Sequence, residues 1–311
     1  MDIISIIMAS GKSAVDIALY TLIPVMVVMI IIMKYLENKG VLAKIVHVSA
    51  PFLRPFGLSG LSLFALIQLN FVSFAAPVAT LAIMDRKGVS DRHLAATLAM
   101  LFAMGQANVL YPLAPLGLNW TLTVALSVIG GLFGGALTWH ITGRGLSDCE
   151  VIPEEEDGPA VPVRKGLIPL INTSGAEAIS LALGAIPMLI LSLTVVGILR
   201  SAGVISMLED GISPLLNYLH IPDVLVMPTL VKCLAGGTAF LGVVSDMLRD
   251  GRVSPHLLNV SGGWFLQTFD LPGIGIMLGA GWRVARVARF AVIGGLAGII
   301  LRTVLHYLIF N

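Results

Sequence analysis

Residues Val224–Met247 read VLVMPTLVKCLAGGTAFLGVVSDM, and after a short polar turn Leu257–Gly273 read LLNVSGGWFLQTFDLPG. Both stretches are apolar enough to lie in a bilayer, yet each contains a charge at depth, Lys232 in the first and Asp270 in the second. Such a charge costs at least ~2.5–3.5 kcal/mol on insertion scales, so it usually faces a partner, a cavity or a substrate. The Gly-Gly-Thr sequence at 236–238 interrupts the first stretch, and irregular backbone survives at that depth only where protein or water shields it. The pattern predicts a polar site inside a membrane protein.

The composition agrees with a membrane protein. The chain has 311 residues, of which 57% are hydrophobic and only 12% are charged, whereas soluble domains carry about 25% charged residues. The sequence therefore predicts an all-α polytopic membrane protein whose first partner is the lipid bilayer. The net charge is +1 with no basic tail, which excludes a nucleic acid polymer as an expected partner. No nucleophile, phosphate-loop or zinc motif is present, so we expect no enzyme activity, catalytic residue, metal or cofactor.

The chain divides into two similar halves. The first membrane repeat covers residues 1–147, an acidic, proline-bearing linker covers 148–166, and the second repeat covers 167–311. Matching landmarks occur in loops as well as in helices, which favours a duplication over chance similarity between Leu/Gly-rich segments. At a shift of 163 or 164 residues the matches are Ile23-Pro24 with Ile186-Pro187, Gly40-Val41 with Gly203-Val204, Val89-Ser90 with Val253-Ser254, and Ile129-Gly130-Gly131-Leu132 with Ile293-Gly294-Gly295-Leu296.

The expected elements of the first half follow from its apolar segments. Residues 10–18 mix polar and apolar positions and predict a short interfacial helix, and Leu19–Met33 predicts a crossing helix. Leu94–Pro112, which is apolar except for two amides, and Trp120–Trp139 predict two more crossings. Each half would then contain about three membrane-crossing helices.

Leu58–Met84 and Val224–Ser245 are the two segments that decide the topology, because each is interrupted by polar residues or glycine. If each dips into the membrane and returns, its arms of about 11–13 residues reach ~16–20 Å, roughly half the bilayer. Each repeat then has an odd number of crossings plus a re-entrant or broken hairpin, and the second repeat is inverted. If these segments span instead, the repeats are parallel.

Loop charge favours the inverted alternative, because Lys and Arg collect on the cytoplasmic side. The stretch 34–54 is basic, whereas its repeat partner, 200–223, is acidic; 112–121 has no charge, whereas its partner, Gly281–Phe290, has three arginines. Inversion places every basic loop on one side of the bacterial inner (plasma) membrane. The linker is then cytoplasmic and both termini lie on the outer side.

Polar side chains recur at equivalent depths in the two halves. Inverted repeats with broken helices are typical of secondary transporters, whose substrates bind near the bilayer midplane. Amides and hydroxyls there can bind a small polar solute, and an acid can bind a cation, take a proton or neutralise a lysine. The alternative is that these groups only hold helices together, with bonds worth on average ~0.6 kcal/mol. We predict a substrate-binding set of Gln68, Asn70, Ser73, Gln106, Asn108, Lys232, Gly237, Thr238, Gln267 and Asp270.

Glycines spaced by four residues lie in the last segment of each half, at Gly130 and Gly134, Gly131 and Gly135, and Gly294 and Gly298. This spacing allows two helices to approach closely. The contact would lie either inside the protomer or at the seam of a homodimer.

A polar-broken hairpin, a turn containing Val-Ser, a helix with a mid-membrane amide or acid, and a glycine-rich closing helix follow one another in each half. This order resembles the nucleoside-recognition (Gate) domain family. Gate domains occur in concentrative nucleoside transporters, in the membrane part of ferrous-iron transporter B and in spore maturation A/B-type proteins. The chain departs from this family by placing Lys232 where a simple sodium site would not have a cation.

The resemblance implies two inverted Gate repeats, a substrate cradle at the hairpin tips, and coupling to an ion or proton gradient. We therefore expect a secondary transporter of a small polar solute, nucleoside-like by resemblance. The alternative function is a non-transporting membrane scaffold or ligand-recognition module in envelope or spore maturation, as in some Gate relatives.

Overall fold

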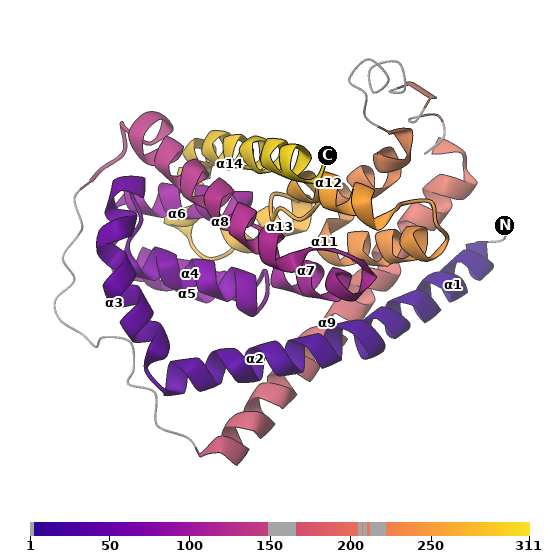
Figure 1. The fold of residues 1–311 in the computed structure, drawn as a ribbon, viewed down its shortest axis with the longest axis horizontal. Coiled ribbons are helices and arrows are strands. Elements are labelled where there is room, and N and C mark those ends of the chain that lie inside the picture. The colour runs from indigo at the N-terminus through magenta and orange to yellow at the C-terminus, as the bar shows by residue number, and fades with distance from the viewer. Residues whose placement is uncertain (1–2, 149–165, 205–206, 208–209, 212–221) are drawn as a thin grey trace.

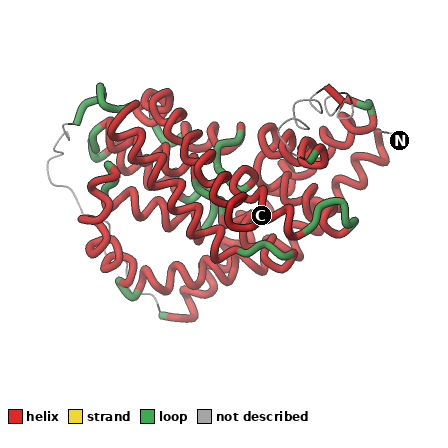
Figure 2. Tube along the Cα trace, turned by 45° about the horizontal axis from the view of Figure 1, so that its top comes forward, coloured by secondary structure: helices red, strands yellow, loops and turns green. Residues whose placement is uncertain are grey.

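The computed structural model describes residues 3–148, 166–204, 207, 210–211 and 222–311. Over these residues the protein is almost entirely helical and contains no strand (Figure 2). Four of its helices are long and apolar enough to cross a membrane: Ile3–Tyr20, Trp120–Thr142, Asp223–Arg249 and Trp282–Phe310. The prediction of an all-α membrane protein is confirmed. Most of the 148–166 linker and of the acidic loop 200–223 lies outside the described residues.

The N-terminal helices form a long arm beside the remaining helices (Figure 1). Helix α1 (Ile3–Asp16) continues through a π-helical turn (Ile17–Leu22) into α2 (Ile23–Asn38). The predicted separate interfacial helix at 10–18 is therefore wrong, because no residue between 10 and 18 ends the helix and the wider turn precedes Pro24 without a break. Helix α9 (Leu167–Ser201) packs along α1 and α2, and Lys34 of α2 forms an ion pair with Glu177 of α9.

The basic stretch 34–54 is mostly helical. Gly40, with φ of 70°, ends α2 in the left-handed region that glycine tolerates. Helix α3 (Val41–Leu53) follows, and a short 3-10 turn (Arg54–Phe56) leads to the hairpin. Gly203, the predicted repeat equivalent of Gly40, has a similar φ of 74°.

Both predicted hairpin segments are broken within the membrane-depth sequence. In the first half, α4 (Gly60–Phe71) and α5 (Pro77–Arg86) pack against each other around a tip at 72–76. In the second half, α11 (Val226–Arg249) is interrupted at Gly236, whose φ is 85° and ψ 179°. The break thus falls where the Gly-Gly-Thr sequence predicted it. Re-entry of these segments into the membrane stays a prediction.

Two further breaks were not predicted. Leu94–Pro112 is divided into α6 (Asp91–Ala103) and α7 (Ala107–Leu113), so the expectation of one continuous crossing helix is wrong. The equivalent segment of the second half is divided into α12 (Pro255–Phe265) and α13 (Leu271–Leu278). The two irregular connections pair in antiparallel fashion at Gly105 and Gln267. Their backbones also bond, from Gln106 N to Leu266 O at 3.2 Å.

The closing helices pack together through the predicted glycines. In α8 (Trp120–Leu137, followed by a π-helical turn to Thr142) and α14 (Trp282–Phe310), a Cβ at Gly130 would lie 2.8 Å from Gly298 O, and one at Gly134 would lie 2.7 Å from Gly294 O. The pairing runs crosswise, so the two helices are antiparallel. Of the two alternatives for this glycine contact, the structure has the one inside the protomer.

Helix α6 lies at the centre of this packing. Every residue from Leu94 to Ala103 is buried, because α14 and α8 cover it on one side and α4 contacts it on another. Its all-round apolar sequence is what a fully enclosed helix requires. The buried helix fixes the position of the break that follows it, where the candidate site lies.

Candidate functional site

The carboxylate of Asp270 is the centre of a buried polar cluster. Asp270 precedes α13 and caps it, with Oδ1 accepting a hydrogen bond from Gly273 N at 2.7 Å. Its Oδ2 forms an ion pair with Lys232 Nζ and accepts from Gln106 Nε2 at 3.2 Å. These three side chains belong to residues that are 1–3% exposed. Enclosed charges of this kind persist only when they are paired and hydrogen-bonded.

Gln106 brings the first half of the chain to the same place. It precedes α7 just as Asp270 precedes α13, and the shift of 164 residues relates the two positions. Its Nε2 also donates to Gln267 O at 3.3 Å. A Cβ at Gly237 would lie 2.4 Å from Gln106 Oε1, so only glycine lets α11 approach this amide so closely.

Asn108 and Thr238 extend the cluster, with Asn108 Nδ2 donating to Thr238 Oγ1 at 3.4 Å. Two buried acceptors here, Asn108 Oδ1 and Gln267 Oε1, have no hydrogen-bond partner among the residues that the structure describes. Buried polar atoms are rarely left unpaired in proteins. These two oxygens are therefore available to hydrogen-bond donors of a ligand.

The hairpin tip of the first half forms a separate group. Gln68 Oε1 accepts from Thr80 Oγ1 at 2.7 Å, Asn70 Nδ2 donates to Leu66 O at 2.9 Å, and the Ser73 amide bonds Gln68 O at 3.2 Å. Within the described part of the chain, no hydrogen bond joins Gln68, Asn70 or Ser73 to the Asp270 cluster. The structure brings together the other predicted residues, from Gln106 to Asp270, but not these three with them. Asn70 Oδ1 is also buried and has no hydrogen-bond partner in the described part of the chain.

Arg302 supports the crossing and was missed by the sequence reasoning. It is fully buried in α14, and its Nε and Nη2 donate to Gly263 O at 3.0 and 2.6 Å while Nη1 donates to Ala103 O at 2.9 Å. These carbonyls lie in the last turns of α12 and α6, where a cation is favoured. The signal was available, because Arg302 is a charge inside an apolar span, as Lys232 is.

Two hydroxyl groups also hold the irregular connections. Ser127 Oγ of α8 accepts from Gly105 N at 2.6 Å, and Thr268 Oγ1 donates to Met104 O at 2.9 Å. Thr268 N further donates to Phe102 O at 3.2 Å. Backbone groups freed by the breaks are thereby satisfied inside the protein, as membrane depth requires.

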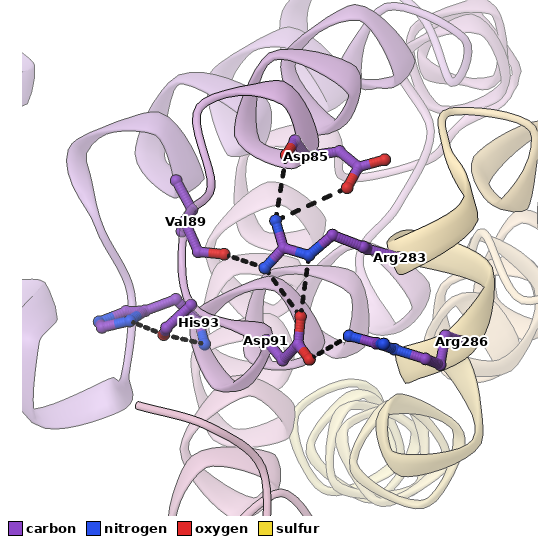
Figure 3. A network of polar contacts seen from close by, with 7 residues as sticks. Asp85, Val89, Asp91, His93, Arg283 and Arg286 are labelled. Carbon is purple, nitrogen blue, oxygen red and sulfur yellow. Dashed lines mark hydrogen bonds and ion pairs between the residues drawn. The ribbon is translucent and has the colours of Figure 1, made fainter. Parts of the chain in front are cut away.

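A second charged network lies at the start of α14 (Figure 3). Arg283 bonds Asp91 Oδ1 at 2.8 Å, Val89 O at 2.5 Å and Asp85 O at 3.0 Å, and Arg286 bonds Asp91 Oδ2. Two of the three arginines of the basic stretch Gly281–Phe290, Arg283 and Arg286, thus hold the turn between α5 and α6. Among the described residues, no group of three or more His, Cys, Asp or Glu side chains could hold a metal ion.

Comparison with known protein families finds one matching family model. Residues 19–111 match the family model described as nucleoside recognition, Gate. This segment is similar to a Gate domain. It runs from the arm through the first hairpin to α7, so it contains the first-half members of the site. No curated protein matches the chain.

Solved structures of CNTnw, a concentrative nucleoside transporter, share the fold of nearly the whole chain. CNTnw in an inward-facing substrate-bound state has 17% sequence identity and a TM-score of 0.65 over 92% of this chain and 74% of CNTnw. A double variant of CNTnw in an outward-facing state has 18% sequence identity to this chain and a TM-score of 0.68, over 98% of this chain and 85% of the CNTnw chain. The chain is a membrane protein with a nucleoside-transporter-like fold.

Proposed function

We propose that this protein is a secondary transporter that carries a small polar solute, nucleoside-like by resemblance, across the inner membrane. The observation that carries the proposal is the meeting of Gln106 and Asp270, which join the two halves of the chain in a buried polar cluster. Transporters bind their substrates at such a repeat interface, where broken helices expose backbone and polar side chains. The Gate domain and the fold shared with CNTnw support the nucleoside-like assignment.

The inverted relation of the two halves is part of the proposal. It is supported by α8 and α14, which are predicted repeat equivalents and both long enough to span a membrane. Their glycines contact crosswise, Gly130 with Gly298 and Gly134 with Gly294. If two repeat-equivalent helices span the membrane in opposite directions, the repeats are related by a two-fold axis that lies in the membrane plane. With the basic stretches inside, the linker is cytoplasmic and both termini are outside.

Roles for the site residues follow from their unpaired groups. Asn108, Gln267 and Thr238 would hydrogen-bond the solute, with Asn108 Oδ1 and Gln267 Oε1 as acceptors. Asp270 and Lys232 would set the charge of the site and its response to an ion or proton gradient. Gln68, Asn70 and Ser73 would complete the cradle from the first hairpin after a rearrangement of the tip.

The test is uptake of a panel of labelled nucleosides and amino acids into proteoliposomes, comparing wild type with Asp270→Asn. We expect nucleoside uptake that falls at least ~10-fold in the variant, because Lys232 is left as an unpaired buried charge. The matched control is Glu177→Gln, which removes the acid of the half-exposed Lys34–Glu177 pair outside the site and should leave uptake intact.

A non-transporting scaffold is the competing function, and labelling separates it from a transporter. Thr238→Cys should react with impermeant thiol reagents from each side of the membrane in turn if the site alternates its access. Thr238 is half-buried beside Gly237, where α11 is broken. Absence of uptake together with protection of this cysteine from both sides would refute transport and favour the scaffold.

A further inference from the structure

The ion pair between Lys232 and Asp270 has a consequence for the driving ion, and this inference rests on the proposed function. We propose that Lys232 is a built-in cation: its ammonium occupies the cation position at Asp270, so the site works without a monovalent metal ion. Lys232 is 1% exposed and reaches Asp270 from α11. A metal ion at the same oxygen would first have to displace the ammonium.

Charge balance around the site supports this assignment. Among the described residues, Asp270 is the single carboxylate that contacts Lys232, and Lys232 the single cation that contacts Asp270. Arg302 is also fully buried, but it donates to the backbone carbonyl oxygens of Gly263 and Ala103 and makes no ion pair with Asp270 among the described contacts. The pair is neutral as a unit. A further metal cation would add an unbalanced charge in a medium where that is costly.

The coordination of Asp270 leads to the same conclusion. Oδ1 is engaged by the amide of Gly273, and Oδ2 by Lys232 and Gln106. The nearby carbonyl of Gln267 already accepts from Gln106. Hard cations require several oxygen ligands, and these three oxygens are engaged by N–H donors. The unpaired oxygens of the cluster among the described residues, Asn108 Oδ1 and Gln267 Oε1, are neutral amide oxygens that cannot balance the charge of a metal ion.

The tether distinguishes this cation from an ion in solution. Lys232 lies four residues before Gly236, on the first arm of α11, so its ammonium moves with that arm and cannot be released with the solute. A neutral solute would then cross without co-transport of sodium, lithium or potassium. In every state in which the Lys232–Asp270 ion pair is formed, Lys232 supplies the positive charge that balances Asp270.

The first experiment measures the wild type in sodium chloride and in N-methylglucamine chloride of equal ionic strength. Nucleoside uptake and the melting temperature in detergent should both be independent of the cation, with uptake changing by less than about twofold, because a ligand stabilises only a protein that binds it. A wild type that loses uptake or unfolds earlier without sodium would overturn the proposal.

The second experiment removes the tethered charge. In Lys232→Ala, Asp270 is left unpaired, so we expect a lower melting temperature in N-methylglucamine and a rise when sodium, lithium or methylammonium is added. The double variant Lys232→Ala/Asp270→Asn should not respond to these cations, since no acid remains to bind them. Lys34→Ala, which breaks the pair with Glu177 outside the site, is the matched control and should not respond either.

The two readouts separate this proposal from the proposed function. Cation-dependent melting of Lys232→Ala with no uptake by the wild type would support the built-in cation and refute transport. Uptake by a wild type that requires sodium would support transport and refute the built-in cation. Folded Lys232→Ala that ignores all small cations would also refute it. If Lys232→Ala does not fold, the wild-type salt comparison alone decides.

Discussion

Replacing Gly298 by alanine should push α8 and α14 apart. A Cβ at position 298 would lie 2.4 Å from the carbonyl oxygen of Gly130 and 2.7 Å from Ala103 Cβ, whereas ordinary contact begins at 3.4 Å. The helices must therefore separate locally by about 1 Å, and overpacking of this kind costs typically ~1–3 kcal/mol. Alanine alone favours the helix by roughly 0.5–1 kcal/mol relative to glycine. The matched control must therefore also replace a glycine by alanine within a helix, so that both variants gain the same helix propensity.

Gly175→Ala is the control, because Gly175 lies within helix α9 and its added Cβ would meet nothing within 4 Å. The difference in the free energy of unfolding between the two variants isolates the clash, at ~1–3 kcal/mol. At ~2–4 °C per kcal/mol, a value typical of domains of 150–250 residues, Gly298→Ala should melt several degrees below Gly175→Ala. Thermal unfolding in detergent, followed by circular dichroism, measures this. Equal melting temperatures would refute the close antiparallel packing.

Two other variants test the break in α11 and the network at the start of α14. Gly236→Ala places a side chain at φ of 85° and 3.1 Å from Pro272 Cγ, whereas Gly251→Ala has a similar φ of 71° and open space. Gly251→Ala carries the ~1–2 kcal/mol strain of a left-handed residue. Gly236→Ala combines a positive φ with a ψ of 179°, a region that essentially only glycine adopts, at a cost of ~1–3 kcal/mol. Only Gly236→Ala should also lose nucleoside uptake, and equal uptake would argue against a site at this break. Asp91→Asn removes the carboxylate shared by Arg283 and Arg286 (Figure 3) and should destabilise the protein by about 1–2 kcal/mol in thermal unfolding. Arg286→Ala, with a side chain that is 51% exposed, should cost less than ~1 kcal/mol, and a larger loss than in Asp91→Asn would contradict the shared role of the acid.

The break at Gly236 could be predicted because its cause is local. Two adjacent glycines in a membrane-depth helix lower its stability, and a glycine tolerates the φ that ends one arm and begins the next. The charges at Lys232 and Asp270 were equally visible, since few polar residues interrupt the apolar segments. The same reasoning applied to the last span would have identified Arg302.

The breaks at 104–106 and 266–270 could not be predicted, because distant residues stabilise them. The backbone at Gly105 is held by Ser127 of α8, and the connection at 266–270 is held by the bonds that Thr268 donates to Met104 O and Phe102 O. No proline or glycine pair marks the first connection within the sequence around Gly105. Only the fold places carbonyl and hydroxyl partners beside the freed backbone groups. The separation of the Gln68 group from the Asp270 cluster is likewise a property of the packing.

The predicted duplication places a chemical constraint on the centre of the site. A two-fold axis brings equivalent residues together, and Gln106 contacts its predicted equivalent, Asp270. Two carboxylates at this distance could not both be ionised, so an amide opposite an acid is the combination that keeps one stable negative charge. At the same shift of 164 residues the predicted equivalent of Lys232 is the neutral Gln68, which bonds Thr80 and is separate from the Asp270 cluster.

Both charges of the site thus belong to the second half of the chain, while the first half contributes only neutral amides. A movement of one half against the other would break the bond from Gln106 to Asp270 without separating the charges. The neutral amide bond is the weaker of the two and can be exchanged for bonds to a solute. The pair of Lys232 and Asp270 is costly to open in the membrane interior. We therefore expect the amide contacts to open first as the solute enters, with the ion pair remaining closed beneath it.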